Sequence, residues 1–216
     1  MSECSLCDEL QKKIGNVPEE YRELVSFGKN VIFESGGVFL IPSFGPLNHS
    51  HSMIVTGKHF NSFAQLPEAD MKSARALIDD LQKRYFEGYG KRLVFFESGA
   101  GSVISHSGEC ISHAHIHCVE ENLEFEKRLF DEVGFFNLNA VPKYSLDDEF
   151  GYVWYRAADG VEYAKNKPLL PSQFLRYLYM QYTSTPEKWN WRRNLNVEGV
   201  EMVLERYKTV FKNNVF

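Results

Sequence analysis

The chain has 216 residues, a net charge of −5, and 44% hydrophobic and 14% aromatic residues. This length fits one domain, or one domain with an extension, and the apolar content is enough for a sizeable core. The negative charge excludes a general surface for a nucleic-acid polymer, so any phosphate ligand must be held by local donors. The apolar runs are too short to span a bilayer, and we expect no membrane partner.

The compartment is predicted from the N-terminus and the cysteines. Met1-Ser2-Glu3-Cys4 is polar and acidic, without the basic and apolar regions of a signal peptide. Four cysteines, two of them close to a row of histidines, do not form a disulfide framework. We therefore expect a cytoplasmic, reduced protein.

In the first part of the chain, the pattern predicts strands and one long helix. Residues 30–34 and 37–41 form a hairpin around Ser35-Gly36, and residues 52–56, 92–96 and 113–119 are three further strands. Pro67 opens a helix with a helically spaced apolar stripe, which consists of Met71, Ala74, Leu77, Ile78, Leu81 and Tyr85. This order predicts an α+β fold in which an antiparallel sheet packs with helices.

After residue 120 the pattern changes. Residues 152–156 are aromatic and β-branched and are predicted as a strand. Two later apolar stripes, beginning near Phe174 and Val200, have helical spacing and are interpreted as core or dimer surface. We predict a first domain over residues 1–120 and a mostly helical extension over residues 121–216 that packs on it.

Three alternating histidines, His113, His115 and His117, are the most informative feature of the sequence. In a strand they would all project from one face, while Ala114 and Ile116 would face a core. Neighbouring members would lie about 6–7 Å apart, which is too wide for all three to reach one metal ion. A catalytic row, with one member used as a ligand, fits better than a three-histidine metal centre.

Residues 108–119, GECISHAHIHCV, resemble the signature of the histidine triad family of nucleotide hydrolases and transferases, in which three histidines alternate with apolar residues. Residues 46–59 are similar to the family's upstream strand, which ends in Lys-His. The resemblance covers about residues 1–120. Residues 172–176 and 189–193 look like an extension found in longer bacterial members.

The resemblance implies a role for each histidine. His115, the middle member, would attack the α-phosphorus of a nucleotide and form a nucleotidyl-histidine intermediate, which splits one displacement into two. His117 would hydrogen-bond the phosphate oxygens, and His51 would donate to the same phosphate or orient the row. The implied substrate is a dinucleoside polyphosphate or a nucleotide conjugate, and the family usually forms homodimers.

The implied substrate-binding positions depart from the family pattern. The backbone at Gly108 can approach a phosphate, but Glu109 replaces a glutamine and cannot donate a hydrogen bond when ionised. Cys110 replaces a hydroxyl residue, and Ser43 replaces the Asp or Asn that usually binds the ribose. Two other functions therefore stay open. One is a nucleotidyltransferase of the galactose-1-phosphate uridylyltransferase type, which has proline where Ala114 stands here; the other is a nucleotide-binding sensor with little turnover.

Cys4 and Cys7 form a CxxC pair at the N-terminus. Alone, the pair is a weak motif, and a thioredoxin-like site would need a strand before it. The family resemblance implies a structural Zn²⁺ held by Cys4, Cys7, His59 and His113 in a tetrahedral Cys₂His₂ site. Such a site would leave His115 and His117 free for catalysis.

Overall fold

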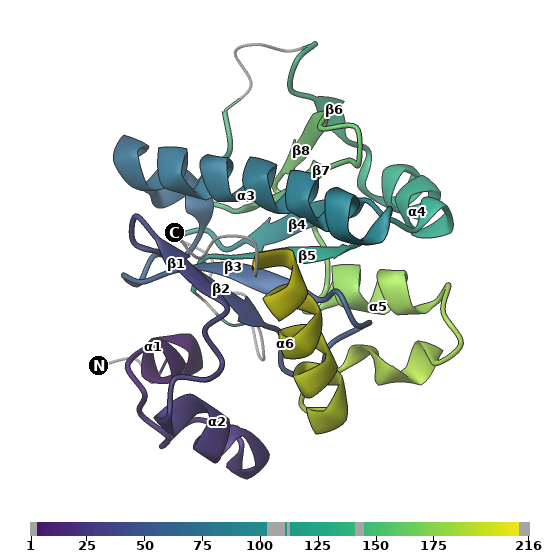
Figure 1. Cartoon of the computed structure of the whole chain (residues 1–216). Coiled ribbons are helices and arrows are strands. Elements are labelled where there is room, and N and C mark those ends of the chain that lie inside the picture. The colour runs from purple at the N-terminus through teal and green to yellow at the C-terminus, as the bar shows by residue number, and fades with distance from the viewer. Residues whose placement is uncertain (1–3, 103–110, 112, 141–144, 212–216) are drawn as a thin grey trace.

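The computed structural model describes residues 4–102, 111, 113–140 and 145–211. Their strands form one antiparallel sheet in the order β1-β2-β3-β5-β4-β7-β8-β6 (Figure 1). The strands are β1 (Phe33–Ser35), β2 (Val38–Pro42), β3 (Ser52–Thr56), β4 (Leu93–Gly99), β5 (His115–Glu120), β6 (Phe136–Asn137), β7 (Tyr152–Arg156) and β8 (Glu162–Asn166). The predicted α+β class, with an antiparallel sheet packed with helices, is confirmed.

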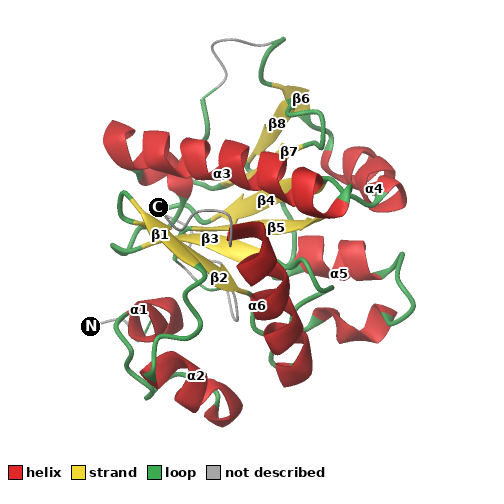
Figure 2. Ribbon diagram, viewed as in Figure 1, coloured by secondary structure: helices red, strands yellow, loops and turns green. Residues whose placement is uncertain are grey.

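Helices cover both faces of the sheet, which gives three layers (Figure 2). One face packs against α3 and α6, and the other packs against α1, α4 and α5. The α-helices are α1 (Ser5–Leu10), α2 (Arg22–Ser26), α3 (Glu68–Tyr89), α4 (Leu123–Val133), α5 (Phe174–Met180) and α6 (Val197–Phe211); short 3₁₀ turns are Glu19–Tyr21, Phe63–Gln65 and Pro186–Trp189. Strand β5 lies between β3 and β4 inside this sandwich.

Most of the predicted elements occur close to their expected positions. Strands β3 and β7 have the expected bounds, and five residues of the α3 stripe, from Ala74 to Tyr85, are buried. Helix α3 ends where Gly90 adopts a left-handed conformation with φ of 64°, which glycine accepts at little cost. Strand β5 begins at His115, two residues later than predicted.

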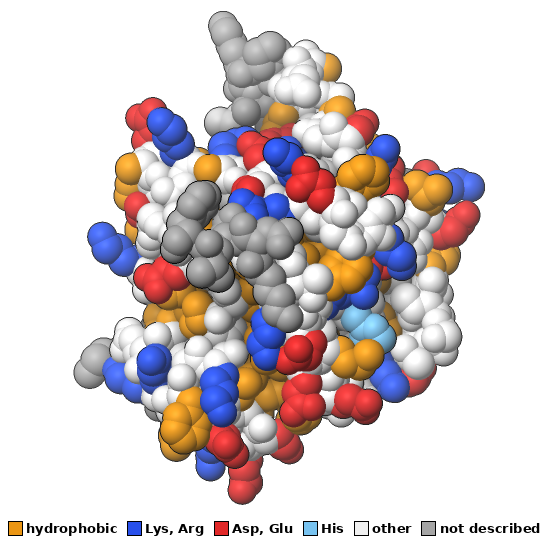
Figure 3. All heavy atoms as spheres, viewed as in Figure 1, with side chains coloured by type: hydrophobic (Ala, Val, Ile, Leu, Met, Phe, Trp, Pro, Cys, Tyr) orange, Lys and Arg blue, Asp and Glu red, His pale blue; other side chains and the backbone are white. Residues whose placement is uncertain are grey.

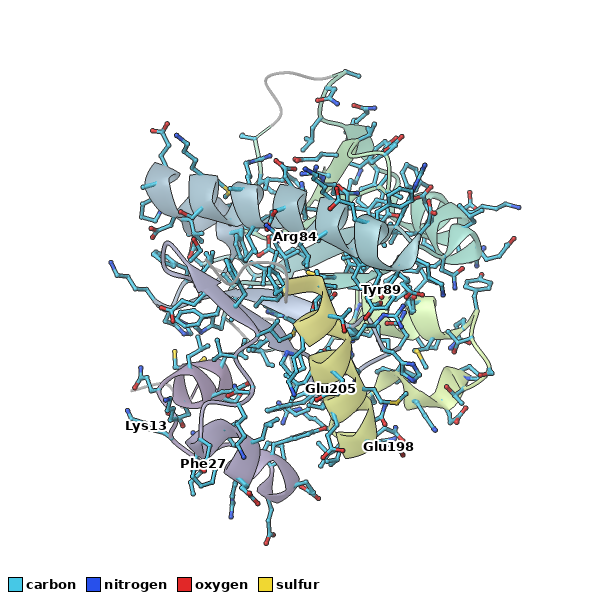
Figure 4. All side chains as sticks on the ribbon, viewed as in Figure 1. Lys13, Phe27, Arg84, Tyr89, Glu198 and Glu205 are labelled. Atoms are coloured by element: carbon cyan, nitrogen blue, oxygen red, sulfur yellow. The ribbon has the colours of Figure 1, made fainter. Side chains whose placement is uncertain are left out.

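Residues after 120 contribute strands as well as helices, because β7 pairs with β4 and extends the same sheet. Helix α6 returns to pack beside α3. The guanidinium carbon of Arg84 lies 5.9 Å from the centre of the Phe211 ring, and the Tyr89 hydroxyl donates to the Arg206 carbonyl (Figure 4). The Tyr207 hydroxyl donates to the Ser50 carbonyl, so α6 also supports the turn that leads into β3. The division at residue 120 stays a prediction.

Charged side chains of both signs are interspersed on the face shown in Figure 3. Within the described ranges, no helix has both the length and the apolar character that crossing a bilayer requires.

Candidate active site and adjoining metal-ligand cluster

Strand β5 carries His115 and His117 on one face of the sheet. His115 lies opposite Val55, and His117 lies between Met53 of β3 and Phe96 of β4. The alternate residues Ile116 and Cys118 point the other way and join the core beneath α3 and α6. The period-two pattern therefore places two imidazoles of the motif side by side, with ring centres 4.9 Å apart.

His113 does not extend this row, because it precedes the strand. The Ala114 amide donates to the Phe60 carbonyl at 2.7 Å, which draws the chain away from the strand pairing of β5. The His113 side chain is fully buried, and its Nε2 lies 2.7 Å from the Thr56 carbonyl oxygen. The strand begins later than the sequence predicts because this local pairing replaces the first two ladder positions.

Hydrogen bonds fix the tautomers of His51 and His117. The Leu47 amide donates to Nδ1 of His51 at 3.0 Å, so the proton of His51 lies on Nε2. Nε2 of His51 is 2.8 Å from Nδ1 of His117 and donates to it. Nε2 of His117 therefore carries a proton, and this N–H is a hydrogen-bond donor at a pocket wall.

The tautomer of His115 is the opposite one. Its Nδ1 is 2.6 Å from the His113 carbonyl oxygen, which can only accept, so Nδ1 carries the proton. Nε2 of His115 then keeps its lone pair. The pair thus offers a nucleophilic nitrogen on His115 beside an N–H donor on His117.

The environment keeps these histidines neutral. Burial lowers the pKa of His115, and the positive charge of Arg176 lowers it further. Burial, followed by neighbouring charges, also lowers the pKa values of His51 and His117 well below the usual range. Because a protonated imidazole has no lone pair, this depression preserves the nucleophile at neutral pH.

Arg176 of α5 is a pocket residue whose role the sequence did not predict. Its buried guanidinium donates to Ser43 Oγ at 3.1 Å, to the Gly45 carbonyl at 2.6 Å and to the Trp189 carbonyl at 3.0 Å. Burial lowers the pKa of Arg176 to about 9. It lies 133 positions along the chain from Ser43, so no local pattern could have paired them.

One pocket joins the histidine pair to helices α1 and α5. Ser43, predicted to contact the substrate, is buried in its wall. The lining of this pocket includes Leu6, Glu9, Val17, Ser43, Phe44, His115, His117 and Arg176. The other predicted substrate-binding residues, Gly108, Glu109 and Cys110, lie outside the described residues.

A second group of side chains lies at the N-terminal side of β5. One donor atom from each of Cys4, Cys7, His59 and His113 falls within 4.8 Å of the others, so the group could hold a metal ion. Nδ1 of His113 is 3.4 Å from both Sγ atoms, and Nδ1 of His59 is 3.4 Å from Sγ of Cys7. The sulfur–nitrogen edge of a tetrahedral zinc site is about 3.6 Å for usual bond lengths.

The residues around this cluster orient its donors. Nε2–H of His113 donates to the Thr56 carbonyl, which leaves the lone pair on Nδ1 directed at the sulfur atoms. The Cys7 amide donates to Sγ of Cys4 at 3.4 Å, an arrangement that suits a thiolate. Burial lowers the pKa of His113 to about 4, and a neutral imidazole is the form that binds a metal. The donor set and spacing therefore fit Zn²⁺.

No family model matches the chain. The chain is 25% identical over 93 residues to an uncharacterized HIT-like protein of Methanocaldococcus jannaschii, where HIT denotes histidine triad. The match covers 41% of this chain and 66% of that protein, slightly less than two thirds of its length.

The matching solved structures include two proteins of the histidine triad family. A zinc-bound histidine triad family protein from Mycobacterium smegmatis is 15% identical, with a TM-score of 0.36 over 56% of this chain and 74% of that chain. A hypothetical histidine triad nucleotide-binding protein from Sulfolobus tokodaii is 11% identical, with a TM-score of 0.36 over 88% and 93%. The motif, the order of the elements and the sequence match confirm the expected resemblance to the histidine triad family.

Proposed function

We propose that the protein is a nucleotide-phosphate hydrolase that acts through a covalent nucleotidyl-histidine intermediate on His115. The observation that carries the proposal is the pairing of a free Nε2 lone pair on His115 with an N–H donor on His117 in one pocket. The proposed substrates are dinucleoside polyphosphates or nucleotide conjugates. The sequence match to a HIT-like protein supports the family resemblance from which this proposal starts.

In the first step, Nε2 of His115 attacks the α-phosphorus. A phosphorus–nitrogen bond forms, the bond from phosphorus to the leaving oxygen breaks, and the leaving group keeps the electron pair. The positive charge that appears on the imidazole is shared through Nδ1–H with the His113 carbonyl. The Nε2–H of His117 stabilises the charge that builds on a non-bridging phosphate oxygen.

In the second step, water attacks the same phosphorus atom. The phosphorus–nitrogen bond breaks, His115 regains its lone pair, and a proton of the attacking water passes to solvent. A nucleoside monophosphate leaves. Ser43 and Arg176 occupy the pocket wall, where they position the ribose and phosphate part of the substrate.

The Cys/His cluster has a structural role in this proposal. Zn²⁺ bound by Cys4, Cys7, His59 and His113 would neutralise two thiolates and join α1 to the entry of β5. The ion takes no part in the reaction. A homodimer and a cytoplasmic location stay predictions from the resemblance and the composition.

The experiment is a comparison of His115→Ala with the wild type on a panel of dinucleoside polyphosphates. We expect turnover by the wild type with water as acceptor, and a loss of at least about a thousandfold in kcat/KM for the variant. His49→Ala is the matched control, because His49 is exposed, and it should keep the wild-type rate.

Near-normal turnover by His115→Ala would refute the assigned nucleophile. Transfer of the nucleotide to a phosphate acceptor in preference to water would show a nucleotidyltransferase. Stoichiometric binding without turnover would show the sensor.

A further inference from the structure

Gln173 is a residue of the histidine pocket that the chemistry proposed above does not use. It directly precedes α5 and lines the same pocket as His115 and His117. Its amide oxygen, Oε1, is buried and has no hydrogen-bond partner in the part of the chain that the structure describes. A buried acceptor without a partner costs free energy, so a ligand that supplies a donor at this point gains affinity.

The backbone of Gln173 adopts a conformation that is unusual for its residue type. Its φ of 57° and ψ of 18° lie in the left-handed region, which residues other than glycine, asparagine and aspartate seldom adopt. The side chain makes no capping hydrogen bond to α5, so helix capping does not explain the presence of a glutamine here. Backbone strain of this kind is concentrated at ligand-binding positions, and here it occurs in a residue that lines the pocket.

The groups near Gln173 indicate which part of a nucleotide would meet it. Arg176 lies one turn further along α5, and together with the histidine pair it is suited to a phosphate. The Ser43 hydroxyl is already engaged, because Oγ accepts from Nη1 of Arg176 at 3.1 Å and donates to the Phe44 carbonyl at 3.3 Å. The sugar is the part of a nucleotide that adjoins the phosphate, and its hydroxyls are donors that need an acceptor. Oε1 of Gln173 offers such an acceptor.

We propose that Gln173 binds the ribose hydroxyls of the substrate and makes the pocket selective for ribonucleotides over deoxyribonucleotides. The inference rests on the proposed function, because it needs a nucleotide in the pocket. One hydroxyl donates to Oε1, and the neighbouring hydroxyl accepts from the Nε2–H of the same amide. The two ends of one amide thus match the 2′ and 3′ hydroxyls of one ribose.

The chemistry of an amide oxygen favours the sugar over the other parts of a nucleotide. Phosphate oxygens are acceptors, and they would be opposed by Oε1 of Gln173. Ribose hydroxyls can donate as well as accept, and every ribonucleotide carries them. A site that hydrogen-bonds a substrate hydroxyl rejects an analogue without it more strongly than a site that depends on shape, because the buried acceptor is then left unpaired.

The test measures binding of AMP, 2′-deoxy-AMP and 3′-deoxy-AMP to the full chain by calorimetry. We expect AMP to bind roughly tenfold more tightly than each deoxy analogue, which corresponds to about 1.4 kcal/mol. Gln173→Met keeps the length of the side chain and removes the amide, so it should bind all three ligands within about twofold of one another. Gln181→Met, at an exposed glutamine just after α5, is the matched control and should keep the wild-type preference.

The same comparison with GMP, CMP and UMP and their deoxy forms should give the same preference, because the contact does not involve the base. If Gln173→Met does not fold, Gln173→Gly takes its place, since glycine accepts the left-handed backbone at little cost. The loss in the variant and the loss in the analogue remove the same contact, so the two losses should not add.

Other results contradict defined parts of the account. Equal binding of the ribose and deoxyribose forms by the wild type overturns the selection of ribonucleotides while the proposed hydrolase stands. A preference that is unchanged in the Gln173 variant shows that another residue binds the sugar, and it overturns the assignment to Gln173. Failure of AMP, GMP, CMP and UMP to bind at all overturns the proposed function as well.

Discussion

The two ends of the histidine motif lie in different sites. His115 and His117 lie on one face of β5, in a pocket where hydrogen bonds leave one lone pair and one N–H for a ligand. His113 precedes the strand and faces Cys4, Cys7 and His59, where its lone pair is directed at two sulfur atoms. One short motif can serve two sites because the strand begins between them.

The two sites are nevertheless joined at one residue. The imidazole of His113 belongs to the cluster, and its carbonyl oxygen accepts the Nδ1–H of His115. A disturbance of the cluster should therefore change the orientation of the nucleophile. Variants in the Cys/His cluster and variants in the pocket can therefore show how far the two sites depend on each other.

The largest expected effect is loss of the cluster. The purified protein should hold about one zinc ion per chain, and Cys4→Ser combined with Cys7→Ser should remove it and lower the free energy of unfolding by several kcal/mol. Elemental analysis and chemical denaturation measure both quantities. Cys118→Ala, which removes a thiol on the other face of the sheet, should keep the metal. Zinc that remains after loss of both N-terminal cysteines would contradict the assigned ligands.

A change behind the pocket wall, at the residue that orients His117, should affect the reaction and leave the metal in place. His51→Ala removes the donor that fixes His117, so we expect kcat to fall roughly 10–100-fold with a smaller change in KM. Steady-state kinetics and a zinc assay on the same sample separate the two regions. Full activity in this variant would show that His51 does not set the tautomer of His117.

Glu9→Gln should stabilise the protein in a pH-dependent way. The folded-state pKa of Glu9, about 8, lies above its ordinary value of 4.5, so ionisation opposes folding as the pH rises from 4.5 through 8. The variant should match the wild type near pH 4.5 and exceed it in free energy of unfolding above pH 8, by roughly 5 kcal/mol. Urea denaturation at the two pH values checks this, and equal differences at both would rule out the burial argument.

The smallest expected effect concerns the charge of Arg176. Its positive charge lowers the pKa of His115, so Arg176→Met should move the acid limb of the kcat/KM profile to higher pH. Arg176→Lys keeps the charge and should leave the limb in place. The pH profiles of kcat/KM are compared for Arg176→Met and Arg176→Lys, measured on variants that fold. If the acid limbs of the two profiles coincide, the charge of Arg176 does not lower the pKa of His115.

The sequence predicted the elements that depend on local patterns. Alternation along residues 115–119 and the apolar stripe of α3 gave the correct strand and helix. The start of β5 was wrong by two residues because the Ala114 amide pairs with Phe60, a contact that alternation does not encode. Arg176 and Glu9 were not predicted as pocket residues, since each looks like an ordinary polar position of a helix until distant segments pack around it. The ligand set of the cluster came from the family resemblance, because one CxxC pair does not identify its partners.

The most direct test of the central claim is the covalent intermediate itself. The wild-type protein is mixed with a dinucleoside polyphosphate, quenched under alkaline conditions within the first turnover, digested and analysed by peptide mass spectrometry. A nucleoside monophosphate attached to the peptide at His115, and absent from His115→Ala, is the result that the account predicts. Rapid turnover with no adduct on His115, or with the adduct on another residue, would contradict it.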